Sequence, residues 1–335
     1  MIRKNEYRYL YLAQFISSLL VVLIHSGTVT DISSLHFMIK SILCRIAVPF
    51  FLVNNAFFYR ARSVEEKKLW LKKVIKIYLI WSIIYLPLGI QFMNEQISLP
   101  LVLYPITFIL GLTYTGIFYH LWYFPALLFS LFVVSKLIKR FGYMKSFILF
   151  GSLYIVGAAE TYSSFITHPL LSKILDTYFS IFLTTRNGLF YSSIFVLIGF
   201  FISDKKEFLL TNRKKMFIGL FFTFVLLCIE GRLIYLNQGR DKNFLMFLIP
   251  LLFFGFPLLF SVYKRSRFGQ LGRYSQAIFF IHLIPIEIFN HSFENADAIT
   301  PSYGIIRFLL GVFVSVFLLY LFEKVKSFFY RTIEN

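Results

Sequence analysis

Long apolar runs separated by short polar segments are the dominant pattern along the chain. An α-helix needs about 20 predominantly apolar residues to cross the hydrocarbon core of a bilayer, and about ten segments meet this requirement. They cover residues 9–27, 39–59, 72–90, 119–136, 146–162, 187–203, 215–233, 244–263, 274–290 and 303–323. The pattern therefore predicts an all-α fold, a polytopic bundle of transmembrane helices.

The apolar segment 99–115 has a different character from the other segments. It contains Pro100, Pro105 and Gly111, which interrupt a helix, so we expect a re-entrant or interfacial piece. Lys and Arg concentrate in cytoplasmic loops, and the positive segments alternate across the membrane only if residues 99–115 do not span it. This arrangement places both termini in the cytoplasm.

The amino-acid composition is also typical of a protein that lies in a lipid bilayer. Of the 335 residues, 58% are hydrophobic and 15% are charged, and the mean hydropathy is +0.72. A soluble domain needs more polar surface than this, whereas a membrane protein leaves apolar side chains facing lipid. We expect residues 1–335 to form a single membrane domain with no soluble domain, placed as a multi-pass protein in the cell membrane.

The net charge of +18 raises the question of a nucleic-acid partner. The basic residues lie in short clusters between the apolar runs. These clusters include Lys67, Lys68, Lys72, Lys73 and Lys76; Lys136, Lys139, Arg140 and Lys145; Arg213, Lys214 and Lys215; and Lys264, Arg265 and Arg267. Such placement is typical of membrane edges, so we expect the lipid bilayer, and no nucleic acid, as the partner of these charges.

Several kinds of site and processing signal are absent from the sequence. Arg3, Lys4 and Arg8 precede the first apolar run without a small-residue cleavage site, which indicates an uncleaved first helix. Cys44 and Cys228 fall inside apolar runs and predict neither a disulfide nor a thiolate metal site. No phosphate loop, dinucleotide fingerprint or zinc-protease motif occurs, so ATP-driven transport and metalloprotease chemistry are not expected.

Ionisable groups at membrane depth are costly, which makes them candidates for function. His25 lies near the outer end of the first segment, and Gln14 precedes it by eleven residues, about three helical turns plus 20°, so the two share one face. An imidazole in a protected cavity can act as a general base toward a hydroxyl group. The alternative is a histidine that simply bonds a backbone carbonyl or a water molecule.

The second apolar segment carries three further polar candidates. Arg45 is suited either to binding an anionic substrate bidentately or to snorkelling toward the outer headgroups. Asn54 and Asn55 interrupt the apolar run, and such amides commonly form packing hydrogen bonds between helices.

The remaining candidates lie near the outer ends of later segments or within them. His120, Trp122 and Tyr123 belong to an aromatic belt for which interfacial anchoring is a sufficient explanation, although His120 adds a group able to transfer protons. The others are Arg186 with Asn187 and Glu230 with Arg232, which pair or contact substrate at outer helix ends, and the more deeply placed His282.

Four stretches together carry a resemblance to a known family, namely VVLIHSG, CRIAVPFFLVNNAFF, YHLWYFPALL and GQLGRYSQAIFFIHLIP. In this order and spacing they resemble the acyltransferase 3 family of integral membrane proteins over nearly the whole chain. Through YHLWYFPA and TTRNGLF the chain resembles in particular the membrane domain of the vancomycin-resistance serine racemases.

The resemblance implies a transferase that moves an acyl group, often acetyl from coenzyme A, onto a sugar hydroxyl of an envelope polysaccharide or peptidoglycan. It also implies that His25 is the catalytic residue. The chain departs from the family pattern at three places: Gln14 stands where the family has an arginine, Tyr11 where it has an acidic residue, and Asn55-Ala56 where it has Ser-Gly. Glutamine keeps the hydrogen-bonding capacity of arginine but lacks its fixed charge.

Two classes of function follow. The first is a membrane-bound O-acyltransferase of the bacterial plasma membrane with no bound cofactor, which uses acetyl-CoA as co-substrate and an envelope glycan as acceptor. In it His25 assists the attack, Gln14 and Arg45 orient the donor, and the aromatic rim holds the sugar. The second is a non-catalytic carrier or binding protein for a small polar substrate such as serine. Neither class excludes a homo-oligomer.

Overall fold

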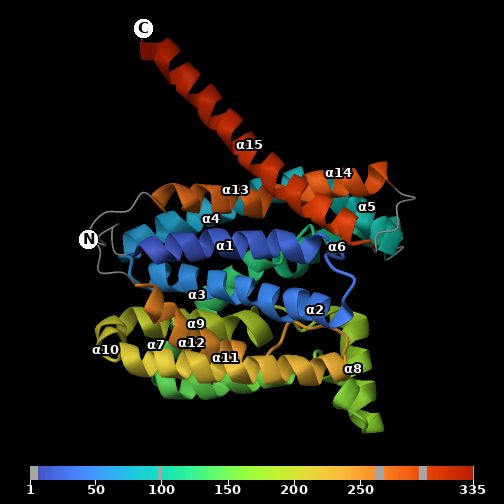
Figure 1. Ribbon diagram of the computed structural model, residues 1–335, viewed down its shortest axis with the longest axis vertical. Coiled ribbons are helices and arrows are strands. Elements are labelled where there is room, and N and C mark those ends of the chain that lie inside the picture. The colour runs from blue at the N-terminus through green and yellow to red at the C-terminus, as the bar shows by residue number, and fades with distance from the viewer. Residues whose placement is uncertain (1–6, 97–99, 261–267, 294–299, 335) are drawn as a thin grey trace. The chain divides into compact units, whose positions relative to one another are not determined.

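The structure, a computed structural model, describes residues 7–96, 100–260, 268–293 and 300–334 (Figure 1). These residues form α-helices, short π-helical and 3₁₀ stretches, and no strand. The predicted all-α class is therefore confirmed. The chain divides into two compact units, Met1–Phe51 with Leu258–Asn335 and Leu52–Pro257, which we call the terminal unit and the central unit.

The terminal unit brings the two ends of the sequence together. Its helices are α1 (Arg8–His25), α2 (Ser33–Phe37), α13 (Leu271–Ile281), α14 (Leu283–Ser292) and α15 (Pro301–Glu334). A π-helical stretch, Met38–Leu43, and a 3₁₀ turn, Cys44–Ile46, follow α2 and lead into α3 (Ala47–Arg60). Helix α13 packs along α1 and also contacts α15, and Figure 1 shows α1 and α13 side by side.

Small residues let the last helix approach the first closely. A Cβ atom added to Gly304 would lie 1.6 Å from the backbone oxygen of Thr28, and one added to Gly311 would lie 2.9 Å from Cγ1 of Val22. Any side chain at Gly304 would therefore clash with the backbone. Close backbone approach through small residues is typical of helix packing inside membranes.

The central unit contains most of the remaining helices, and α3 enters it from the terminal unit. Its helices are α3 (Ala47–Arg60), α4 (Val64–Ile84), α5 (Leu86–Gln96), α6 (Tyr104–Leu110), α7 (Tyr123–Ala158), α8 (Pro169–Phe182), α9 (Ser193–Asp204), α10 (Lys206–Thr211), α11 (Arg213–Leu236) and α12 (Leu248–Gly255). Helix α9 forms the core, because Phe195, Val196, Leu197 and Ile198 have no exposed surface. A helix that is apolar all round is expected at such a position.

Each of the predicted segments contains helical structure in its described residues, but not each is one long helix; residues 261–263 of the predicted segment 244–263 lie outside the described residues. Within the described chain, four helices are long and apolar enough to cross a membrane: Arg8–His25, Ser33–Arg60, Arg213–Leu236 and Pro301–Ser327. Val64–Ile84 and Leu86–Asn94 pass the same test together and are bent by 56°. These helices support a membrane protein embedded in a lipid bilayer.

Two segments show how the lengths of the observed helices relate to the predicted apolar runs. Helix α7 contains Gly142 at φ 72°, which bends the chain between the predicted segments 119–136 and 146–162. In the segment 99–115, expected not to span, the described residues form a 3₁₀ turn, Leu101–Leu103, the 7-residue helix α6 and the π-helical turn Gly111–Thr115. The location of the termini relative to the membrane stays a prediction.

An ion pair joins three helices of the central unit outside the predicted spans. The Arg60 guanidinium donates two hydrogen bonds to Asp204, from Nε to Oδ1 at 2.9 Å and from Nη2 to Oδ2 at 2.8 Å. The Tyr143 hydroxyl donates to the same carboxylate at 2.7 Å. Burial raises the pKa of the Asp204 carboxyl, but these hydrogen bonds outweigh it and bring the pKa below its usual value.

Candidate functional site

His25 is the last residue of α1 and lies beside a second histidine. Its ring centroid is 5.6 Å from that of His282, and the two ring planes are inclined by 34°. The two residues are far apart in the sequence, yet they meet because α13 packs along α1. The structure thus pairs two histidines that the sequence singled out separately.

The backbone around His282 determines which ring nitrogen carries the proton. The residue stands at the junction of α13 and α14 and has no exposed surface. Its Nδ1 lies 2.8 Å from the carbonyl oxygen of Ile278 and 3.0 Å from that of Phe279. Carbonyl oxygens only accept hydrogen bonds, so we assign the hydrogen to Nδ1, which leaves Nε2 as the basic nitrogen of the neutral ring.

Gln14 lies on the same side of α1 as His25. The backbone oxygen of Gln14 accepts a hydrogen bond from the Ser275 hydroxyl at 3.0 Å. Its side-chain Oε1 would lie 3.7 Å from a Cβ atom on Gly272. Because Gly272 and Ser275 belong to α13 and His282 follows that helix directly, the expectation that Gln14 and His25 share one face is confirmed.

Cations gather near the end of α1. Lys40 is only 7% exposed, and its ammonium group donates a hydrogen bond to the backbone oxygen of Leu23. It lies within electrostatic reach of Arg45 and Arg307. Arg307 is also 7% exposed, and its Nε donates to Asn290 Oδ1 at 2.6 Å. Buried cations of this kind favour a bound anion or a developing negative charge.

Lys40 and Arg307 were missing from the candidates drawn from the sequence. Both lie inside predicted spans, at the start of residues 39–59 and near the start of residues 303–323. The rule that selected His25, an ionisable group within an apolar run, selects these two residues as well. The signal that could have found them is therefore present in the sequence.

The other candidate residues belong to the central unit. Asn55 Nδ2 donates to the Tyr123 hydroxyl at 2.7 Å, which is the packing role expected as one alternative. The His120 ring packs edge-on against Tyr85, with centroids 4.6 Å apart. The Arg186 guanidinium lies over the Trp122 ring at 5.0 Å. These candidates of the central unit therefore make aromatic and amide contacts within that unit.

Asn187 and Glu230 make well-defined structural contacts within the central unit. The Asn187 side chain accepts hydrogen bonds from the backbone N–H groups of Leu189 and Phe190 and so caps the helical segment that follows. Glu230 is 5% exposed and accepts hydrogen bonds from the Tyr162 hydroxyl and, at 3.1 Å, from the backbone N–H of Phe247. A contact of either residue with substrate stays a prediction.

Sequence reasoning missed Glu160, a buried carboxylate that fixes the loop before Arg186. One of its oxygens accepts hydrogen bonds from the Thr185 backbone N–H at 2.8 Å, the Thr185 hydroxyl at 2.7 Å and the Thr184 hydroxyl at 2.9 Å. Glu160 closes the predicted segment 146–162 and was the only acidic residue in it, a signal that could have found it.

Metal chemistry has no ready site in the part of the chain that the structure describes. No group of three His, Cys, Asp or Glu side chains there could hold a metal ion. The arrangement in the terminal unit can instead accept a proton at an imidazole and stabilise negative charge with neighbouring cations.

Comparison with known proteins gives two kinds of match. Among curated proteins, an "Amino-acid racemase" of Enterococcus faecalis is 29% identical over 279 residues, which cover 79% of this chain and 38% of the relative. A "Serine/alanine racemase" of Enterococcus gallinarum is 25% identical over 306 residues, which cover 88% of this chain and 42% of the relative. The chain thus spans less than half the length of these relatives.

No solved structure matches the chain. A family model described as "Acyltransferase domain" matches residues 7–323, which include His25, His282, Lys40 and the candidates of the central unit. By this match, the chain belongs to the acyltransferase 3 family.

Proposed function

We propose that the protein is a membrane-bound O-acyltransferase that moves an acetyl group from coenzyme A to a hydroxyl group of an envelope glycan. Family membership supports acyl transfer, and the bacterial relatives support a multi-pass protein of the bacterial plasma membrane. The observation that carries the proposal is the pairing of His25 with His282 beside the buried cation Lys40.

In this proposal His25 is the catalytic base. Its neutral imidazole takes the proton of the acceptor hydroxyl while the oxygen attacks the thioester carbonyl of the donor. A new carbon–oxygen bond forms and the carbon–sulfur bond breaks. The leaving thiolate of coenzyme A then takes the proton from the imidazolium, so His25 returns to its starting state and no external reagent is needed.

The cations near the end of α1 stabilise the negative charge that develops in this step of the proposal. The carbonyl oxygen of the donor gains negative charge in the transition state, and fixed positive groups lower the energy of that charge in a dry site. Lys40 is the first candidate for this role because it bonds the backbone only two residues before His25. Arg45 and Arg307 add positive potential for an anionic donor.

His282 and Gln14 act in the proposal as positioning residues. His282 is held by two backbone carbonyls, so its ring offers a rigid neighbour for the ring of His25. Gln14 supplies uncharged hydrogen-bonding groups farther along the same face of α1, at the position where the family has an arginine.

The test is the acylation of envelope glycans in cells with and without the gene, measured by mass spectrometry. We expect O-acetylated glycan units to disappear when the gene is deleted and to return when the wild-type gene is restored. A glycan profile that the deletion leaves unchanged would contradict the proposal.

A carrier for a small polar substrate such as serine is the second candidate. It is favoured by Gln14, which lacks the charge of the family arginine, and by the name "Serine/alanine racemase" of one relative. Uptake of labelled serine into proteoliposomes distinguishes the two candidates. Transport without any acyl turnover would favour the carrier.

A further inference from the structure

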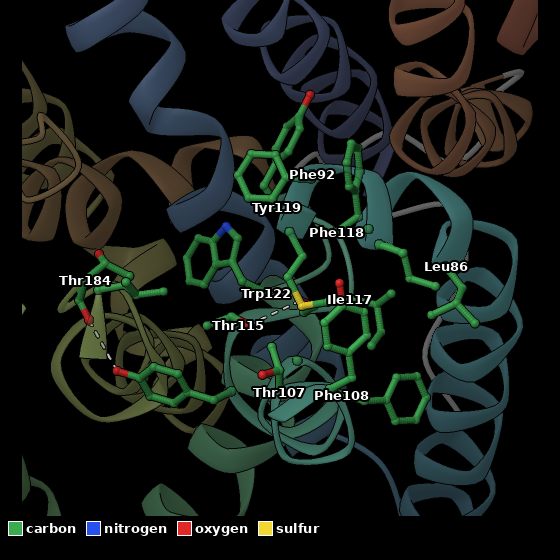
Figure 2. Close-up of a pocket in the computed structure, with 18 of the residues that line it drawn as sticks. Leu86, Phe92, Thr107, Phe108, Thr115, Ile117, Phe118, Tyr119, Trp122 and Thr184 are labelled. Atoms are coloured by element: carbon green, nitrogen blue, oxygen red, sulfur yellow. Dashed lines mark hydrogen bonds between the residues drawn. The ribbon is translucent and has the colours of Figure 1, made fainter. Parts of the chain in front are cut away.

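A cavity of about 620 Å³ lies within the central unit, and its lining does not include the residues proposed for catalysis. Helices α5 and α6, the chain from Gly111 to Trp122 and the loop from Leu183 to Arg186 enclose it. Figure 2 draws Phe92, Phe118 and Tyr119 on one side of the cavity and Thr107 and Phe108 on the opposite side. Its volume falls in the range of about 300–1,000 Å³ that is typical of small-molecule sites.

The walls of this cavity are mainly apolar and continue onto exposed apolar surface. Phe92, Phe108 and Leu183 line the cavity, and they are respectively 42%, 44% and 59% exposed. Exposed apolar side chains of this type are suited to contact with lipid in a membrane protein. The mouth of the cavity is therefore continuous with exposed apolar surface on which an alkyl chain could lie.

Arg186 is the only charged side chain among the described residues that line the cavity. Its guanidinium lies over the Trp122 ring at 5.0 Å, and its Nε is buried without a hydrogen-bond partner in the described part of the chain. The salt bridges found among the described residues do not include Arg186. A guanidinium stacked on a ring still presents a planar fork of donors at its edge, which suits a phosphate group.

The loop that carries Arg186 is held in place before any ligand arrives. The backbone N–H of Arg186 donates to the Thr184 hydroxyl at 3.0 Å, and that hydroxyl donates to Glu160. The Tyr114 hydroxyl donates to the backbone oxygen of Thr184 at 3.2 Å, the contact marked near Thr184 in Figure 2. Pre-organisation of this kind lowers the entropy lost on binding.

We propose that this cavity binds a phospholipid with a net negative headgroup, with an alkyl chain among the aromatic side chains and the phosphate at Arg186. An apolar lining with a single cation matches an anionic amphiphile. A sugar would need several hydrogen-bonding groups around it, and a zwitterionic lipid would present a cation of its own near Arg186. The site does not depend on acyl transfer, so it stands or falls separately from the proposed function.

Fluorescence of Trp122 tests the site directly, because bromine atoms on an alkyl chain quench a tryptophan that they touch. The chain contains three tryptophans, so Trp70 and Trp81 are first replaced by phenylalanine in the full-length protein. The purified protein in detergent is then titrated with brominated phosphatidylglycerol or with brominated phosphatidylcholine. We expect half-maximal quenching by phosphatidylglycerol at a concentration about tenfold lower, since one charge-assisted contact changes affinity by about that factor.

Variants distinguish the contribution of the Arg186 charge from that of the space inside the cavity. Arg186→Ala should remove the preference for phosphatidylglycerol, whereas Arg232→Ala should keep it; Arg232 is exposed, lies 5.7 Å over the Tyr235 ring and does not line the cavity. Thr107→Phe, which fills part of the cavity, should weaken quenching by both lipids. Equal quenching of the Trp122 protein by the two lipids, or an unchanged preference in Arg186→Ala, would overturn the proposal.

Competition gives a readout that needs no change at Arg186. Unlabelled phosphatidylglycerol should restore the fluorescence of protein quenched by brominated phosphatidylcholine, at about one tenth of the concentration that unlabelled phosphatidylcholine needs. Equal competition by the two lipids would again contradict an anionic-lipid site. This result holds or fails even if Arg186→Ala does not fold.

Discussion

The terminal and central units differ in the sign of the charge that they bury. In the central unit the buried carboxylates Glu160 and Glu230 each accept several hydrogen bonds from side chains and backbone N–H groups of the same unit. In the terminal unit the buried ionisable groups of the described chain include Lys40, Arg307 and His282. Lys40 and His282 contact backbone carbonyl groups, and Arg307 contacts the Asn290 amide and lies over the Phe289 ring.

This difference indicates two uses of buried polar groups. A carboxylate that accepts hydrogen bonds from several chain segments stabilises the fold, because its charge is compensated by oriented donors. Cations that contact carbonyl and amide dipoles or an aromatic ring keep much of their positive potential, which is available to an anion or to a transition state. This difference supports the proposal that places the chemistry in the terminal unit, and it gives the carboxylates of the central unit a structural role.

The largest effect should come from removing the base. His25→Ala should lower the rate of acyl transfer by about 10²–10⁴-fold, the usual contribution of a general base. The matched control is His291→Ala, which removes an exposed histidine of α14 in the same unit. Transfer is measured with labelled acetyl-CoA and isolated envelope glycan. Equal rates of acyl transfer for the two variants would contradict the role of His25 as the base, and with it the assignment of the chemistry to the terminal unit.

The next largest effect concerns the stability of the central unit. Glu230→Ala leaves the buried N–H of Phe247 without its acceptor, so the free energy of unfolding should fall by about 1–3 kcal/mol. The control is Glu207→Ala in α10, where the side chain is exposed. Denaturation of the purified protein in detergent measures the change. A loss of transfer without any loss of stability would instead place Glu230 at the substrate.

A smaller effect is expected at the buried lysine. Lys40→Met keeps the apolar stem but removes the charge near His25, and transfer should fall by about tenfold, the factor that 1.4 kcal/mol represents. Lys145→Met, at an exposed position of α7, is the control. If both variants keep full activity in the acetyl-CoA assay, the cations of the terminal unit have no part in catalysis.

The smallest effect concerns pH and the ion pair outside the spans. The folded-state pKa of Asp204 lies below its usual value, so the ion pair contributes stability above about pH 4 and loses it as the pH falls through the lowered folded-state pKa. Arg60 and Asp204 are partly exposed, 27% and 32%, and we expect about 1 kcal/mol at neutral pH.

The Asp204→Asn variant provides the comparison for this pH dependence. Its stability at neutral pH should be lower than that of the wild type, and the gap should close as the medium is made acidic. Thermal unfolding followed at several pH values measures both curves. If the difference in stability between the wild type and Asp204→Asn stays constant over the acidic range, the charge of Asp204 is not the cause of that difference.

Much of the fold was predictable because the bilayer constrains sequence strongly. Backbone groups in lipid must form hydrogen bonds within their own segment, so apolar runs of sufficient length become helices. The helices at 8–25, 213–236 and 301–327 lie where the apolar pattern places them. Gly142 breaks the helical backbone between the predicted segments 119–136 and 146–162, but the bend between α4 and α5 was not predicted, because hydropathy gives the length of an apolar run and not its straightness.

The helical class, the membrane environment and the shared face of Gln14 and His25 could be predicted from the amino-acid sequence, since they follow from local composition and helical periodicity. Three contacts could not be predicted in this way: that of His25 with His282, that of Lys40 with the backbone before His25, and that of Arg186 with Trp122 beside a cavity. These contacts join segments distant in sequence, and their geometry depends on how the helices pack rather than on any local pattern.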